Sequence, residues 1–96
     1  MGVYFILAND AKREYVDPEQ IGGGNIKRSG MVYGPMAHLF MFLTLRESGW
    51  SVLADTSDEY TAAYYEFNNV TKDVVDEYNK GTSYESDHIR YRDDDP

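Results

Sequence analysis

The feature that most constrains the fold is residues 34–49, GPMAHLFMFLTLRESG, whose pattern predicts a helix that is apolar on more than one side. Pro35 suits the first helical turn, Arg46 the last turn, and Gly49 the position that ends the helix. At about 100° per residue, one stripe of this helix is expected to cover a sheet. The stripe consists of Met36, Leu39, Phe40 and Leu43.

The opposite side of this predicted helix is apolar as well. Met41, Phe42 and Leu45 lie there, with His38 among them. A domain of 96 residues with two layers has little material left to cover a second apolar side. Two alternatives stay open: the side contacts a second copy or a partner protein, or the glycine-rich segment or the C-terminal tail covers it. Phe42→Asp is expected to give a monomer or a misfolded chain.

Other patterns complete an α+β domain over residues 1–81. Apolar, aromatic and β-branched runs predict four strands, at residues 3–8, 13–17, 50–55 and 62–70. A second helix is expected over residues 71–81, with Thr71 as its N-cap and Gly81 at its end. The order β-β-α-β-β-α favours a mainly antiparallel sheet with the helices on one face. Residues 82–96 are polar and acidic and predict a flexible tail.

The charge balance is strongly acidic. The chain has 17 acidic and 9 basic residues, a net charge of −8, and its lysines number only four. Three explanations stay open: a cytoplasm at high salt, an acidic surface that meets a basic partner or imitates DNA, and ordinary solubility. The acidic residues are spread along the chain and concentrate only at residues 93–95.

The same composition argues against several classes of protein. There is no cysteine, so the chain has no disulfide framework and no thiolate metal site. Residues 1–10 lack the basic start of a signal peptide, and no apolar run reaches the roughly 20 residues of a membrane span. The net charge opposes a nucleic-acid partner, although tyrosines can stack on bases. We therefore expect a cytoplasmic protein.

Three short blocks resemble small uncharacterised proteins of haloarchaea and actinobacteria. The first is YFILANDAKREYVDP at residues 4–18, which is similar to their Tyr-x-Leu-Ala-Asn…Lys-Arg-Glu-Tyr opening; the others are WSVLAD at 50–55 and FNNVTKDVVDEYN at 67–79. Members of that family often carry extra residues after the third strand, which this chain lacks. The resemblance implies kinship and no activity. Its haloarchaeal branch agrees with the acidic, lysine-poor composition.

The glycine-rich segment IGGGNIKRSGMVYGP, residues 21–35, invites comparison with phosphate-binding loops. It fails the P-loop pattern, because Arg28 separates Lys27 from Ser29, and its consecutive glycines fail the dinucleotide pattern. Lys27, Arg28 and Ser29 nevertheless precede a predicted helix start, where free N–H groups favour anions. An anion site and a flexible connection both stay open.

Catalytic and metal-binding patterns are sparse. The two histidines, His38 and His88, have no local nucleophile signature around them, and abundant carboxylates make any chance pair uninformative. The acidic segment at residues 55–59 lacks the length and the glycine of a calcium loop. We predict no catalytic residue, no metal site and no cofactor, and the residues favour a non-catalytic protein over an enzyme.

The sequence therefore predicts a small acidic protein-interaction module of a high-salt cytoplasm, homodimeric through its first helix. The contact residues would be His38, Met41, Phe42 and Leu45. One alternative is a small anion-binding or ligand-binding protein, or a minor enzyme, that uses Lys27, Arg28 and Ser29. Another is an acidic decoy of a basic, nucleic-acid-binding protein.

Overall fold

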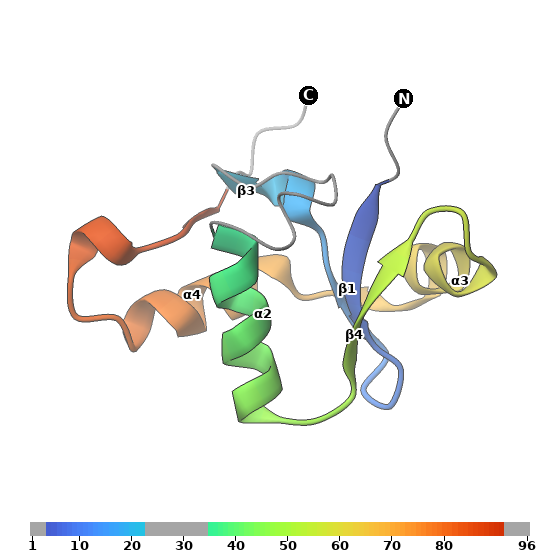
Figure 1. Ribbon diagram of the computed structural model, residues 1–96, viewed down its shortest axis with the longest axis horizontal. Coiled ribbons are helices and arrows are strands. Elements are labelled where there is room, and N and C mark those ends of the chain that lie inside the picture. The colour runs from blue at the N-terminus through green and yellow to red at the C-terminus, as the bar shows by residue number, and fades with distance from the viewer. Residues whose placement is uncertain (1–3, 23–34, 92–96) are drawn as a thin grey trace.

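The computed structural model describes residues 4–22 and 35–91 (Figure 1). The predicted α+β class is confirmed, because helices pack on a four-stranded sheet. In chain order, the elements are β1 (Phe5–Asn9), β2 (Glu14–Val16), η1 (Pro18–Gln20), β3 (Ile21–Gly22), α2 (Pro35–Arg46), β4 (Trp50–Ala54), α3 (Asp58–Glu66), β5 (Asn68–Asn69), α4 (Thr71–Lys80), η2 (Glu85–Asp87) and β6 (Arg90–Tyr91).

The sheet is built around the β1–β2 hairpin that the sequence predicts. β1 lies between β2 and β4 and pairs antiparallel with both, so that Leu7 is opposite Val16 on one side and Val52 on the other. The short β5 pairs in parallel with β2 and completes the order β4-β1-β2-β5. A separate two-stranded antiparallel sheet joins β3 to β6.

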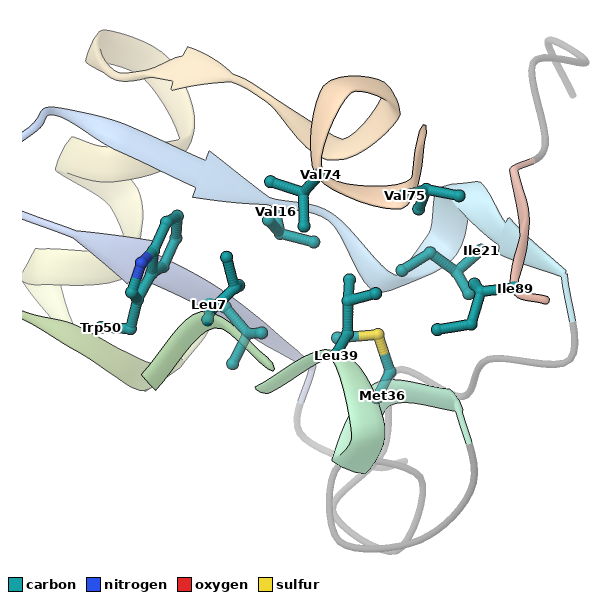
Figure 2. Close-up of a cluster of buried hydrophobic side chains, with 10 residues drawn as sticks. Leu7, Val16, Ile21, Met36, Leu39, Trp50, Val74, Val75 and Ile89 are labelled. Carbon is teal, nitrogen blue, oxygen red and sulfur yellow. The ribbon is translucent and has the colours of Figure 1, made fainter. Parts of the chain in front are cut away.

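Alternation along β1 divides the interior into two cores. Leu7 belongs to the larger core, on the side of α2 and α4. That core contains the buried residues Leu7, Val16, Ile21, Met36, Leu39, Leu43, Trp50, Val74, Val75 and Ile89 (Figure 2). Ile6 and Ala8 face the other way and pack with Tyr15 and with Ala63 of α3. The two predicted helices share one face, whereas α3 covers the face that was expected to carry none (Figure 1).

Helix α3 replaces most of the strand predicted over residues 62–70, of which only β5 is observed. The helix starts because the Ser57 hydroxyl accepts a hydrogen bond from the Tyr60 N–H at 3.2 Å. Asp58 and Glu59 then lie in the first turn, where the helix dipole favours negative charge. The tyrosines of this segment suggest a strand, but the N-terminal cap and the burial of Ala63 favour a helix.

The ends of α2 and α4 differ in part from the prediction. Gly81 ends α4 as expected, but the N-cap is Val70, and the Thr71 hydroxyl instead accepts the Asp17 N–H at 2.8 Å. Helix α2 ends at Arg46, three residues before Gly49. Gly49 has a φ of +102° in the turn to β4, and a Cβ there would lie 3.0 Å from Asn9 Oδ1. Glycine is therefore required at position 49 by the turn to β4 and not by the end of the helix.

The chain after residue 81 also differs from the flexible tail that the sequence predicts. Ile89 is buried in the larger core, and β6 pairs with β3. Asn79 binds Ile89 at both backbone groups: its Nδ2 donates to the carbonyl at 2.7 Å, and its Oδ1 accepts the N–H at 2.7 Å. The packed domain therefore continues to Tyr91, and residues 92–96 lie outside the described part.

Candidate functional site

The inner side of α2 fills the larger core as its spacing predicts. Met36, Leu39 and Leu43 are fully buried, and Phe40 packs against the same core from a half-buried position. These side chains recur every three to four residues, which is the period of one helix face. The orientation of α2 on the sheet is thus set by its apolar stripe, and this orientation determines which side chains face away.

The outer side of α2 presents three of the four predicted contact residues. Met41 is 64% exposed and Leu45 is 84% exposed. The two lie four residues apart, so they are neighbours on the helix surface, and His38 is also exposed. We call His38, Met41 and Leu45 the outer face of α2. The structure brings these three together, in agreement with their helical spacing.

Phe42, the fourth predicted contact residue, belongs elsewhere. It is half-buried, and its ring meets Tyr78 of α4 edge to face with 5.5 Å between the ring centres. The Arg46 guanidinium lies 5.9 Å from the centre of the Phe42 ring. The sequence prediction could not place Phe42 correctly, because only the position of α4 shows that this flank of α2 is covered.

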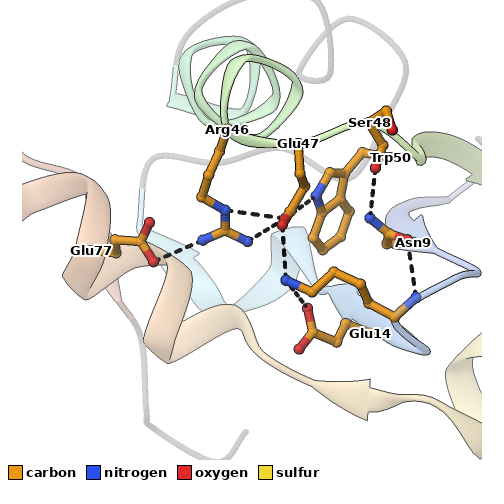
Figure 3. Close-up of polar contacts among 8 residues, drawn as sticks. Asn9, Glu14, Arg46, Glu47, Ser48, Trp50 and Glu77 are labelled. Atoms are coloured by element: carbon orange, nitrogen blue, oxygen red, sulfur yellow. Dashed lines mark hydrogen bonds and ion pairs between the residues drawn. The ribbon is translucent and has the colours of Figure 1, made fainter.

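A polar cluster at the C-terminal end of α2 holds the helix against the sheet (Figure 3). The Glu47 carboxylate accepts hydrogen bonds from the Lys12 ammonium at 2.9 Å, from the Arg46 guanidinium at 3.1 Å and from the Trp50 indole N–H at 2.8 Å. The bond from Arg46 is the largest of the effects that lower the Glu47 pKa to about 2. Because Arg46 also binds Glu77 of α4 at 2.8 Å, this cluster joins three elements.

Buried Asn9 fixes the two turns beside this cluster. Its Nδ2 donates to the Ser48 carbonyl at 3.2 Å, and its Oδ1 accepts the Lys12 N–H at 3.2 Å. Neither Asn9 nor Glu47 was predicted from the sequence to be a functional residue. Asn9 belongs to the Leu-Ala-Asn stretch of the first resembling block, and both residues lie near the ends of predicted elements, but neither signal assigns them a role.

The predicted anion-binding residues Lys27, Arg28 and Ser29 lie outside the described residues. The anion site therefore stays a prediction. His88, which follows η2, is exposed, and its Nε2 lies 2.9 Å from the Thr82 carbonyl oxygen. Within residues 4–22 and 35–91, no group of three or more His, Cys, Asp or Glu side chains is placed to hold a metal ion.

Comparison of the chain with protein-family models, with curated proteins and with solved structures finds no match. The resemblance to small haloarchaeal and actinobacterial proteins therefore stays a prediction. Among the helices that the structure describes, none is long and apolar enough to cross a membrane.

Proposed function

We propose that the protein is a non-catalytic interaction module that contacts a second copy of itself through the outer face of α2. The observation that supports this proposal most directly is the exposure of Met41 and Leu45 at adjacent positions of one helix. In a two-fold symmetric contact, each of these side chains meets the same surface of the other copy, so both copies bury them together.

The size of this face predicts a weak dimer. Met41 and Leu45 from two copies would contribute roughly 6–12 kcal/mol if fully buried. Association itself costs about 4–15 kcal/mol. The helix has 12 residues and is therefore about 18 Å long, too short to supply the roughly 800 Å² per partner of a stable interface. Two copies would accordingly associate and dissociate readily.

The test is the molar mass in solution, measured by light scattering over a concentration series that reaches about 1 mM. We expect the mass to rise with concentration toward twice that of the chain. Molar salt should favour this rise, because it screens the repulsion between two copies that each carry a charge of −8. A mass that stays at one chain throughout the series would refute self-association through this face.

Matched variants identify the face. Met41→Ser/Leu45→Ser should stay monomeric, since both side chains are exposed and their loss should leave the fold intact. Tyr84→Ser removes another large exposed side chain, outside α2, and should associate like the unmodified protein. Equal association by the double variant would contradict the proposal. Phe42→Asp is unsuitable here, because it would place a charge against Tyr78 in the domain itself.

The proposed setting is a cytoplasm at high salt. The support is the net charge of −8, which destabilises a compact chain at low ionic strength through self-repulsion. The free energy of unfolding, measured by urea titration, should therefore rise when KCl is increased from about 0.1 M to 1 M, because the Debye length falls from roughly 10 Å to 3 Å. No rise would indicate that the acidic residues serve ordinary solubility.

A further inference from the structure

Helix α3 carries a group of tyrosines in mutual ring contact on the face of the sheet opposite α2. The Tyr60 and Tyr64 rings are nearly parallel, with an angle of 7° between them and 5.9 Å between their centres. Tyr64 also contacts Tyr15 of β2 at 5.6 Å and Tyr65 edge to face at 5.4 Å. Tyr64 is 38% exposed and Tyr65 78% exposed. We call Tyr60, Tyr64 and Tyr65 the tyrosine surface.

Carboxylates border this surface. Asp17 lies two residues after Tyr15, so it projects toward the same face as the ring that contacts Tyr64. Glu19 follows in η1 and is exposed. Burial raises the pKa of Tyr60 to about 12, and the charges of Asp17 and Glu19 add to this rise. Among the described residues, neither carboxylate forms an ion pair.

The chain itself contains an example of how such a surface binds a cation. The Arg13 guanidinium lies over the Phe67 ring, 4.8 Å from its centre. The same guanidinium lies 3.7 Å from the Glu66 carboxylate, at the end of α3. An aromatic face and a carboxylate therefore bind one guanidinium together at the edge of this face. The tyrosine surface offers the same combination of groups to a cation from outside.

We propose that the tyrosine surface, with Asp17 and Glu19 at its border, binds an arginine side chain in a basic segment of another protein. The planar guanidinium stacks on aromatic rings and pairs with carboxylates, whereas the compact lysine ammonium does so less well. At low salt, the net charge of −8 also attracts a basic segment over a longer range. It also repels nucleic acid, whose bases could otherwise stack on the same rings.

The proposal is independent of self-association through α2, because the two surfaces lie on opposite faces of the sheet. The test is fluorescence anisotropy with a labelled peptide of repeated Arg-Gly-Ser units. Peptides with Lys or Glu in place of Arg serve as references. We expect the arginine peptide to bind several-fold more tightly than the lysine peptide, and the glutamate peptide not to bind. Equal affinity for arginine and lysine peptides would overturn the proposal, because it would indicate charge attraction alone.

Variants of Tyr64 separate the ring from its hydroxyl. Tyr64→Leu should weaken binding about three- to tenfold, the size of a cation–π contact, while Tyr64→Phe should bind like the unmodified protein. Tyr84→Leu removes an exposed ring outside this surface and should have no effect. Undiminished binding by folded Tyr64→Leu would overturn the proposal. If that variant fails to fold, Tyr65→Leu, at a more exposed position, should show a loss of at least twofold, and no loss would overturn the proposal.

Glu19→Gln tests the role of charge. It removes one negative charge from an exposed position and should weaken binding about two- to threefold at low salt. At molar salt, this difference should disappear, whereas the loss in Tyr64→Leu should persist, because a direct contact is screened less than a distant charge. A Glu19→Gln effect that persists unchanged at molar salt would contradict the border role assigned to this carboxylate.

Discussion

The two faces of the sheet are covered by different kinds of side chain. On the α2–α4 face, ten buried residues form a core in which all but Trp50 are aliphatic or Met, and the Arg46–Glu77 ion pair joins its helices. On the α3 face, four residues are buried, half-buried Leu53, Tyr60 and Phe67 pack against them, and Tyr64 and Tyr65 are exposed. Buried aliphatic side chains exclude water fully, whereas a tyrosine can bury its ring and leave its hydroxyl in contact with solvent. The first face therefore provides most of the stability, and the second leaves a usable surface.

The largest test of this comparison uses neighbouring residues of β1. Leu7 and Ile6 are equally buried but face opposite cores. Leu7→Ala should cost about 3–5 kcal/mol of unfolding free energy, and Ile6→Ala about 2–3 kcal/mol, because the smaller core can collapse more easily around a cavity. Urea unfolding of both variants measures the difference. A larger loss for Ile6→Ala would mean that the α3 face is the more rigid of the two.

The next test concerns the buried hydroxyl at the start of α4. Thr71→Val removes the acceptor of the Asp17 N–H and should cost about 1–3 kcal/mol, since that group is left without a partner. Thr71→Ser keeps the hydroxyl and is the matched control, which should lose less. Equal losses in thermal unfolding would show that the methyl group matters and the hydrogen bond does not.

The cap of α3 should matter somewhat less. Ser57→Ala removes the acceptor for the Tyr60 N–H and should cost about 1 kcal/mol. Ser57→Asp, which retains a capping oxygen, should lose little. Because α3 carries the tyrosine surface, Ser57→Ala should also weaken the binding of the arginine peptide. Unchanged far-ultraviolet dichroism and unchanged stability would show that packing alone holds α3.

The smallest expected effect is a pH dependence confined to the α2–α4 face. The pKa of Glu47 is lowered to about 2 in the folded protein. The free energy of unfolding that the ionised Glu47 contributes is therefore present above the ordinary glutamate pKa and is lost as the pH falls from about 5 to 2. Solvent screening should keep this contribution below about 1 kcal/mol. Trp50, the one tryptophan of the chain, donates to Glu47 and reports the change by fluorescence.

For Glu47→Gln, the difference in stability between pH 7 and pH 3 should shrink relative to the unmodified protein. Glu85→Gln, at an exposed position outside the cluster, should leave that difference unchanged. If Glu47→Gln keeps the full pH dependence, other carboxylates cause it, and the cluster at the end of α2 is only a geometric support.

Some of this protein follows from local sequence alone. An apolar run before a turn predicted β1, and a second run after that turn predicted its hairpin partner β2. Pro35 and the periodic apolar residues that follow it predicted α2. These elements were predictable because alternation and helical period are local properties of the chain. The position of Met41 and Leu45 opposite the core stripe followed from the same period, whereas their exposure did not, since other segments could have covered that side.

The remainder depended on contacts between distant segments. Phe42 was misplaced because α4 covers its flank, and Ile89 joins the core because Asn79 holds its backbone. Helix α3 was missed because aromatic residues favour strands on average, while its cap and the uncovered side of β1 favour a helix there. Local pattern thus determined which segments fold regularly, and only tertiary packing decided which side chains remain available to a partner, because burial depends on what lies opposite.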